Sequence, residues 1–402
     1  MNEPVRDASA SGFSRSGYNY RLYITFLIHV LFSQAIVGLA RLATSYRSLE
    51  LGFSVEALGV ITGSFALLPI FLAVPLGRWL DKGKDAQALR AGSLLMVVSC
   101  LGFWIDALTE ATMIFYMLLM GVGYLFIMAG QQTLAIRCAE PRNRDSVFGT
   151  YMVGIAVGQG IGPIVVGVIA RGTSVAPSSP LFGIAAASAV IALAISFLVQ
   201  KAPAPARRHG NVIKVPLKDL LAIRGFMPMM LASVITVTSL DLLVVYMPLM
   251  GAERQIDASV IGMLLTVRTG VSVATRAFFS PLVRKVGRVR LMVICLLMSG
   301  AAFAVFVVPS PVWLMILSMT VTGVGLGIAT ALALSSIVDL APPEAQGTAV
   351  TLRITGNRVG QVALPLLAGV AASATGAAGV LGLIGLSVAA SGLAVFVSQR
   401  RK

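Results

Sequence analysis

Residues 158–167 read GQGIGPIVVG, and residues 360–369, which follow 202 positions later, read GQVALPLLAG. The same offset relates, without a gap, a longer series of glycine, proline and glutamine residues. The matched pairs are Gly121 and Gly323, Gly123 and Gly325, Pro141 and Pro343, Gly154 and Gly356, Gly158 and Gly360, Gln159 and Gln361, Pro163 and Pro365, and Gly167 and Gly369. A gapless series of this kind predicts that the chain is an internal duplication.

Both copies of the motif lie inside long apolar stretches. Of the 402 residues, 57% are hydrophobic and 12% are charged, whereas about 25% are charged in a typical soluble domain. Apolar runs of roughly 20 residues, the length that crosses the hydrocarbon core of a bilayer, recur along the chain. We therefore predict an all-α integral membrane protein with twelve transmembrane helices, near residues 22–41, 55–77, 91–108, 111–136, 147–170, 180–200, 226–249, 259–280, 290–308, 311–338, 346–371 and 376–398.

The duplication divides these helices into two pseudo-symmetric bundles of six. The N-terminal bundle is expected at residues 1–200 and the C-terminal bundle at residues 225–402. Between them, residues 201–224 form the longest polar stretch, which reads as a cytoplasmic linker with a short interfacial helix after Pro216. A parallel repeat relates two such bundles by an axis along the membrane normal.

The net charge of +15 is distributed in a way that indicates membrane orientation and not nucleic-acid binding. With both termini placed in the cytoplasm, the outward segments hold only Arg41, Arg47, Arg171 and Arg254. Cytoplasmic segments of membrane proteins are enriched in Lys and Arg. We therefore expect a multi-pass protein of the inner (plasma) membrane, with cytoplasmic termini and the lipid bilayer as its surroundings. The first twenty residues lack the apolar core of a cleaved signal, so the first span is expected to be retained.

The sequence offers no pattern for a metal or a disulfide framework. The cysteines Cys100, Cys138 and Cys295 are scattered, and the two histidines, His29 and His209, lie far apart. Metal sites need such residues at close and regular spacing. We expect no metal and no cofactor. Because no phosphate-binding loop ending in Gly-Lys-Ser/Thr is present, we also expect no direct use of ATP.

A loop after the second span carries a family resemblance. Residues 77–84 read GRWLDKGK, and the corresponding residues 280–288 read SPLVRKVGR. The first copy resembles the signature cytoplasmic loop of the major facilitator superfamily of secondary transporters, whose glycine, acid and glycine fall on Gly77, Asp81 and Gly83. The resemblance implies that this loop helps to latch the two bundles, with Asp81 near the positive end of a facing helix. In the second copy, Arg284 stands where the acid would be.

The stretch 158–167 resembles the fifth-helix motif of the superfamily's antiporter branch, which includes bacterial drug and metabolite:proton antiporters. The motif positions fall on Gly158, Gly162, Pro163 and Gly167. Small residues four positions apart let a neighbouring backbone approach closely, and a bundle accommodates the bend that proline introduces. Static close packing explains each glycine alone, whereas the resemblance implies a pliant seam between moving helices.

Few ionisable residues are predicted inside the spans, and an ionisable group in mid-membrane usually faces an aqueous cavity. Asp241 is the one carboxylate well inside a span, about 12 Å from its outer end at 1.5 Å per residue. Arg268 lies at a similar depth in the next span. The eleventh span adds Arg353, Asn357, Arg358 and Gln361. The resemblance places helices seven, eight and eleven around one half of a central cavity, so these residues are candidates for the substrate and proton pathway.

Two interpretations of this group remain open. In the first, Asp241 pairs with Arg268 or Arg358, as buried charges usually do. Alternatively, Asp241 binds and releases a proton while an unpaired arginine binds an anionic group of the substrate. Deep arginines outnumber the one deep carboxylate, which favours an anionic or zwitterionic solute.

The first half offers weaker candidates. His29 and Gln34 on the first span and Gln131 on the fourth could line the cavity, or could hydrogen-bond to neighbouring helices. Arg41 is interpreted as a residue of the outer mouth or an interfacial anchor. Met117 stands where drug/proton antiporters carry a fourth-helix arginine, so a coupling scheme that uses this arginine is not carried over.

These observations and the resemblance together predict a secondary transporter and not an enzyme, since no set of nucleophile, base and metal is visible. We expect a monomer that moves a small organic solute, coupled to protons and directed outward, by alternating access of the two bundles. One alternative is a multidrug efflux antiporter for apolar or cationic compounds. Another, from a different class, is a membrane receptor or scaffold that transports nothing.

Overall fold

The computed structural model describes residues 20–80, 82–138, 144–199, 217–342 and 345–400. Within these ranges every regular element is a helix, as expected where a lipid solvent requires backbone groups to bond internally. The helices are α1 (Tyr20–Glu50), α2 (Val55–Leu80), α3 (Asp85–Ile105), α4 (Glu110–Cys138), α5 (Arg144–Ile169), α6 (Ser178–Leu198), α7 (Leu217–Ala222), α8 (Phe226–Glu253), α9 (Ala258–Ala277), α10 (Phe279–Val286), α11 (Arg288–Phe303), η1 (Ala304–Phe306), α12 (Val312–Leu340) and α13 (Gln346–Arg400).

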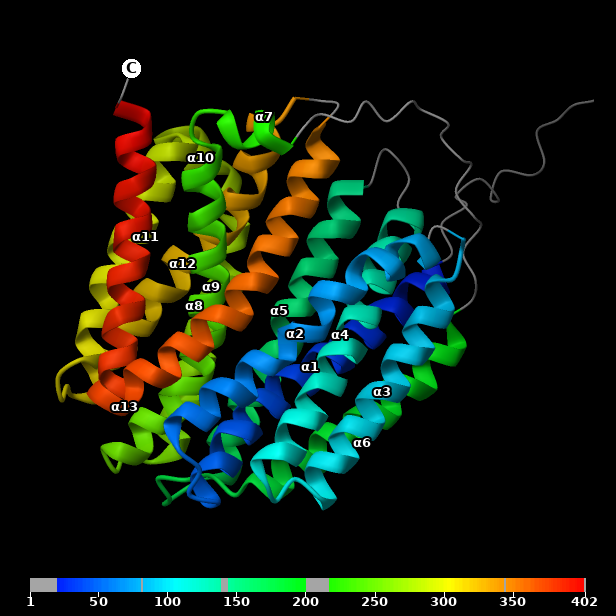
Figure 1. Ribbon diagram of the computed structural model, residues 1–402, viewed down its shortest axis with the longest axis vertical. Helices are drawn as coiled ribbons and strands as arrows, with labels where there is room; N and C mark the ends of the chain where they lie inside the picture. The colour runs from blue at the N-terminus through cyan, green and yellow to red at the C-terminus, as the bar shows by residue number, and fades with distance from the viewer. Residues whose placement is uncertain (1–19, 81, 139–143, 200–216, 343–344, 401–402) are drawn as a thin grey trace, which may run out of the picture.

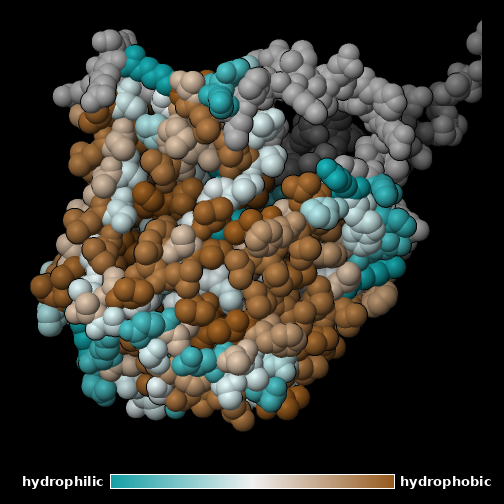
Figure 2. Space-filling view, viewed as in Figure 1, coloured by the Kyte–Doolittle hydropathy of each residue, from teal (hydrophilic) through white to brown (hydrophobic). Residues whose placement is uncertain are grey.

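Eleven helical segments of the described chain are long and apolar enough to cross a membrane. The last of them, Thr348–Ser398, contains 51 residues. Within it the backbone leaves the helical region at Gly376, with φ 69° and ψ 179°, and Figure 1 shows the chain reversing direction there. In Figure 2 a broad apolar surface lies between hydrophilic groups at the top and bottom of the molecule, as a multi-pass membrane protein requires.

Each predicted span falls on a described helix, but some helix ends were placed too early. The largest difference is in α1, which was predicted to end near residue 41 and continues to Glu50. No glycine or proline interrupts the chain between Arg41 and Gly52, and Gly52 adopts a φ of 67° that ends the helix. Arg41 therefore lies inside a helix and not at its outer end. The short helix α7 begins where the sequence predicted one, after Pro216.

The internal repeat is visible in the helix packing. We call α1–α6 the N-terminal set and α8–α13 the C-terminal set. In the N-terminal set α3 packs on α4, α2 on α4 and α1 on α5, and the corresponding helices of the C-terminal set make the same pairs: α11 with α12, α9 with α12 and α8 with α13. Matched glycines also make matched contacts. A Cβ atom added at Gly123 would lie 3.0 Å from the Gly92 carbonyl oxygen, and one added at Gly325 would lie 2.7 Å from the Cys295 carbonyl oxygen.

The two sets meet backbone to backbone near the face that carries residues 51–54, 170–177 and 254–257, which we call the distal face. There α2 packs on α13 and α5 packs on α9. A Cβ atom added at Gly59 would lie 2.6 Å from the Pro365 carbonyl oxygen, and one added at Gly262 would lie 2.6 Å from that of Pro163. At these points the helices are close enough to exclude any side chain between them.

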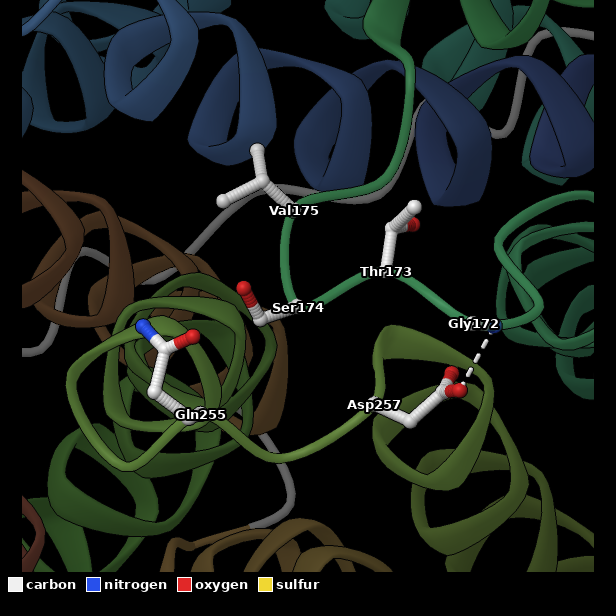
Figure 3. Close-up of a pocket in the computed structure, with 6 residues that line it drawn as sticks. All are labelled: Gly172, Thr173, Ser174, Val175, Gln255 and Asp257. Carbon is white, nitrogen blue, oxygen red and sulfur yellow. Dashed lines mark hydrogen bonds between the residues drawn. The ribbon is translucent and has the colours of Figure 1, made fainter.

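Two loops add hydrogen bonds between the sets at the distal face (Figure 3). The Gly172 N–H donates to Asp257 Oδ2 at 2.7 Å, and the Ala258 N–H donates to the Thr173 carbonyl oxygen at 2.7 Å. Asp257 Oδ1 also accepts from the Ser259 N–H at 2.7 Å, which caps α9. These hydrogen bonds, those from Ser259 foremost, lower the pKa of the Asp257 carboxyl. We call this arrangement the distal latch.

The opposite face holds α7, α10 and the end of α13 (Figure 1). Cβ atoms added at Gly77 on α2 or Gly149 on α5 would meet no other atom within 4 Å. Between described residues of the two sets on this side, Arg276 Nη1 donates to the Met152 carbonyl oxygen at 2.9 Å. Among the glycines compared here, Gly59 and Gly262 at the distal face meet backbone of the other set, whereas Gly77 and Gly149 do not.

Candidate functional site

The centre of the candidate site is the Asp241 carboxylate on α8. Its Oδ1 atom forms an ion pair with Arg41 of α1, and its Oδ2 atom accepts a hydrogen bond from Gln361 Nε2 of α13 at 2.6 Å. The Arg41 and Asp241 side chains are 16% and 18% exposed. One of the two interpretations named Arg268 or Arg358 as the ion-pair partner of Asp241, and the structure pairs it with Arg41 instead. The observed pair joins the N-terminal and C-terminal sets.

Asp241 also lies deeper than predicted. The helix continues to Glu253, so about 18 Å of α8 separates Asp241 from its distal end, at 1.5 Å per residue. This depth places the ion pair near the middle of a hydrocarbon core about 30 Å thick.

Aromatic rings from the N-terminal set cover two of the guanidinium groups. The Arg41 guanidinium lies 4.7 Å from the centre of the Phe65 ring, and that of Arg358 lies 5.8 Å from the centre of the Tyr124 ring. The two rings are themselves 5.5 Å apart. Arg358 Nη1 also donates to Gln361 Oε1 at 3.0 Å. Cation–π contacts and the Gln361 amide thus hold these arginines beside Asp241.

Arg268 lies on α9, which contacts α8. Asp241 lies within electrostatic range of Arg268, Arg358 and Tyr124. The half-buried Arg268 guanidinium donates to Thr269 Oγ1 at 3.0 Å, and its Nε atom has no hydrogen-bond partner in the described structure. The group formed by Arg41, Asp241, Arg268 and Arg358, called here the central charge group, has one carboxylate and three guanidinium groups.

Arg353 and Asn357 lie away from this group, toward the face near the C-terminus. Arg353 Nη1 donates to Ser233 Oγ at 3.0 Å, and Ser233 Oγ donates to Asn357 Oδ1 at 3.2 Å. Together with Gln361 they form the predicted stripe of α13, which runs along α8. Only Gln361 of that stripe touches Asp241.

Gln34 on α1 is a fully buried junction of the N-terminal set. Its Oε1 atom accepts from Gln159 Nε2 at 3.0 Å and from the Tyr124 hydroxyl at 3.4 Å, and its Nε2 atom lies 3.1 Å from the Met128 sulfur. It contacts the central charge group only through Tyr124.

His29 and Gln131 form a separate buried cluster. His29 Nε2 lies 3.1 Å from Ser93 Oγ, and its Nδ1 atom lies 3.0 Å from Gln131 Nε2, which also donates to Ser33 Oγ at 2.9 Å. His29, Gln131, Ser33 and Ser93 are all fully buried. The structure does not bring this cluster to Asp241, and its contacts match the interpretation of hydrogen bonding between neighbouring helices.

The glycines of the 158–167 motif make two kinds of contact. A Cβ atom added at Gly158 would lie 2.7 Å from the Leu31 carbonyl oxygen, and Gly162 contacts Gly38, so both pack on α1 within the N-terminal set. Pro163 and Gly167 instead contact Gly262 of α9 in the other set. The motif therefore lies partly at the seam between the sets.

The signature loop is described in part, because Asp81 lies outside the described residues. Gly83 has a φ of 77°, which favours glycine, and its N–H donates to the Leu80 carbonyl oxygen at 2.9 Å. In the second copy, where Arg284 replaces the acid, Arg288 forms an ion pair with Asp339 at the end of α12.

Comparison with known proteins identifies the family. The family model of the Major Facilitator Superfamily matches residues 22–250 and 229–402. The chain belongs to this superfamily. No curated protein matches the chain in sequence.

Solved structures of other superfamily transporters share the fold. The nucleoside transporter NupG has a TM-score of 0.76 at 15% identity, covering 95% of this chain and 100% of its own. The peptide transporter POT in complex with sulfate has a TM-score of 0.74 at 16% identity, covering 95% and 94%. A bacterial homolog of the human lysosomal transporter Spinster, inward-facing and unoccupied, has a TM-score of 0.72 at 10% identity, covering 95% and 96%. At these identities the likeness shows the fold alone.

Sequence reasoning missed Arg41, Phe65 and Tyr124 as members of the site. Arg41 was predicted to lie at the outer mouth or the membrane interface, because the first span was predicted to end near residue 41 and not at Glu50. The uninterrupted helical stretch from Arg41 to Glu50 was the signal that could have corrected this. Phe65 and Tyr124 had no distinguishing signal among the apolar residues of their spans.

Proposed function

We propose that the chain is a secondary transporter of the inner membrane, with twelve transmembrane helices in two six-helix bundles at residues 1–200 and 225–402. The repeat at an offset of 202 residues and the reversal at Gly376 support this count. The basic residues of the segments around α7 and α10 support cytoplasmic termini. In this orientation the distal face, where the two sets are in close contact, is external.

The solute is a small organic anion or zwitterion. The observation that carries this proposal is the central charge group in mid-membrane, in which one carboxylate contacts Arg41, is linked to Arg358 through Gln361 and lies within electrostatic range of Arg268. Uncompensated charge is costly in a medium of low dielectric constant. An anionic solute offsets the positive excess, whereas a cation increases it.

Asp241 is the proton site. When it is ionised, it holds Arg41 and thereby joins α1 of one set to α8 of the other. Protonation removes the negative charge and breaks this ion pair. Proton occupancy is thus linked to the contact between the two sets, which is the link that proton-driven alternating access needs.

The proposed direction is outward. It rests on the likeness of residues 158–167 to the antiporter motif and on the contact of Pro163 and Gly167 with the opposite set. Solute leaving the inner compartment while protons enter would support this direction. Solute and protons that move together would overturn it and leave the anion carrier standing.

Flux through proteoliposomes tests the function. Purified protein is reconstituted with and without a pH gradient and offered labelled organic anions, cations and apolar compounds. We expect pH-driven flux of anions, and we expect Asp241→Asn to abolish the pH-driven component while it retains exchange of solute for solute. Asp106→Asn, at an exposed carboxylate that accepts from Tyr116, is the matched control and leaves both intact.

A second candidate is a multidrug antiporter, which one feature favours. An apolar groove of about 250 Å³ lies between α2 and α4, lined by Leu72, Pro75, Leu76, Trp79 and Phe126. Flux of apolar or cationic compounds alone would support this candidate against the anion carrier. No flux of any compound by correctly folded protein would instead favour a receptor or scaffold.

A further inference from the structure

We propose that the transported solute carries two negative charges, a dicarboxylate or a phosphate monoester, and that Arg268 and Arg358 bind it. This inference rests on the proposed function of an organic-anion carrier and specifies the charge of its solute.

Arg41 accounts for one of the three positive charges of the central charge group. The Asp241 carboxylate forms an ion pair with Arg41, so these two groups neutralise each other. Arg268 and Arg358 remain. Among described residues, Arg268 donates to a threonine hydroxyl and Arg358 to the amide oxygen of Gln361, both of which are neutral acceptors. With Asp241 ionised, the central charge group therefore has an excess of two positive charges.

The two remaining guanidinium groups have donors to spare. Each guanidinium carries five N–H donors, and the Nε atom of Arg268 has no partner among described residues. Arg268 comes from α9 and Arg358 from α13, and both lie within electrostatic range of the same Asp241 carboxylate. Gln361 links Arg358 directly to Asp241, so two cations from different helices lie near this carboxylate.

Charge matching selects among solutes at such a site. A dianion compensates both guanidinium groups, a monoanion leaves one of them uncompensated, and a cation adds a third. The guanidinium fork fits carboxylate and phosphate oxygens, because it donates two parallel hydrogen bonds to either group. The surrounding Gln361 and Thr269 side chains are polar and add no further charge.

A series of one carbon skeleton tests the charge directly. The thermal stability of the purified full chain in detergent is measured with succinate, monomethyl succinate and dimethyl succinate, at a pH at which free carboxyl groups are ionised and at constant ionic strength. Inorganic phosphate and glycerol 3-phosphate form the second arm, which distinguishes a phosphate from a dicarboxylate. We expect a dianion, either succinate or one of the two phosphate compounds, to stabilise the protein at a concentration about tenfold or more below the concentration of monomethyl succinate that gives the same effect. A tenfold ratio corresponds to about one hydrogen bond to a charged group.

Variants of the two arginines test the site. Arg268→Gln and Arg358→Gln each remove one positive charge, so each is expected to abolish the preference for the dianion over the monoanion. Arg268→Lys and Arg358→Lys keep the charge and are expected to keep the preference. The matched control is Arg254→Gln, because Arg254 donates to carbonyl oxygens of residues 306–308 at the distal face, far along α8 from Asp241.

The outcomes separate this inference from the function on which it rests. Equal stabilisation by monomethyl succinate and succinate, or no stabilisation by any dianion, overturns the dianion inference and leaves the flux experiment to decide the anion carrier. Stabilisation only by dimethyl succinate or by added cations overturns both. A dianion preference that survives Arg268→Gln and Arg358→Gln overturns the assignment of these two residues.

Discussion

The Arg41 and Asp241 side chains each make a further contact besides their ion pair. Arg41 lies against the Phe65 ring as well as the carboxylate, and Asp241 accepts from Gln361 on its second oxygen. Because Arg268 and Arg358 lie near the same carboxylate, Arg41→Ala lowers the excess positive charge of the central charge group from two to one, whereas Asp241→Asn raises it to three. Removal of both partners leaves the excess at two.

Asp241→Asn is therefore expected to destabilise the protein more than Arg41→Ala, and the double variant serves to measure how strongly the two side chains are coupled. Breaking a buried pair costs about 3–5 kcal/mol, and the partial exposure of this pair places the expected cost at or below the lower end of that range. A double-mutant cycle on thermal unfolding in detergent measures the coupling, which is expected to exceed about 1 kcal/mol. Additive effects of the two substitutions would show that the ion pair adds nothing to stability.

The sequence located much of the candidate site and missed its cross-set partner. Asp241, Arg268, Arg358 and Gln361 stood out as polar groups in apolar spans, and the structure brings all four together. Spacing along one helix identifies residues that share a face, but it does not identify the helix that faces them. That information comes from packing, which is why Arg41 was assigned elsewhere.

At the scale of helices, the seams between the sets depend on glycine. Gly262 of α9 lies against Pro163 and Gly167 of α5, and Gly59 of α2 lies against Pro365 and Gly369 of α13. The two contacts occupy nearly equivalent places in the repeat. Helix existence was predictable from hydropathy alone, whereas these contacts required the folded arrangement of both sets.

Gly262→Ala is expected to destabilise the described state. The new methyl group would lie 2.6 Å from the Pro163 carbonyl oxygen, and this contact involves backbone that cannot move aside without shifting a helix. Overpacking of this kind costs about 1–3 kcal/mol. Gly270→Ala on the same helix is the control, since a Cβ atom there meets nothing within 4 Å. Equal shifts of the melting temperature for the two variants would contradict the close packing.

The distal latch gives a prediction about pH. Hydrogen bonds lower the pKa of Asp257, so the ionised carboxylate stabilises the folded state above the usual carboxyl pKa of about 4. This contribution is lost as the pH falls through the lowered value. Asp257→Asn keeps one acceptor oxygen for the α9 cap but lacks the second for Gly172. The melting temperature of the wild type should exceed that of Asp257→Asn by a constant amount above pH of about 4. This difference should shrink as the pH falls further. A gap that widens in acid would contradict this sign.

For the whole molecule, the repeat relates the two seams to each other. The 202-residue offset brings α5 onto the first part of α13 and α2 onto α9, so one seam is the counterpart of the other. A rigid rotation of one set against the other therefore loosens both seams together. This symmetry fits a molecule in which both seams open and close as one.

The orientation in the membrane can be tested by cysteine labelling. In a variant without the three native cysteines, Ser174→Cys at the distal face is expected to react with a membrane-impermeant maleimide in intact cells. Arg284→Cys, at the exposed surface of α10, should react only after the cells are broken. The reverse pattern would invert the proposed orientation.

The close contact between the two sets at the distal face, called here the distal seal, and the central charge group are built from different parts of the chain. Backbone amides, carbonyl oxygens and glycine Cα atoms make most of the seal, whereas side chains make the central group. Exchange of a side chain in the centre leaves the atoms of the seal in place. Selectivity can therefore diverge by single substitutions while the mechanical cycle is inherited unchanged, which makes this scaffold a favourable starting point for evolving or engineering new cargo.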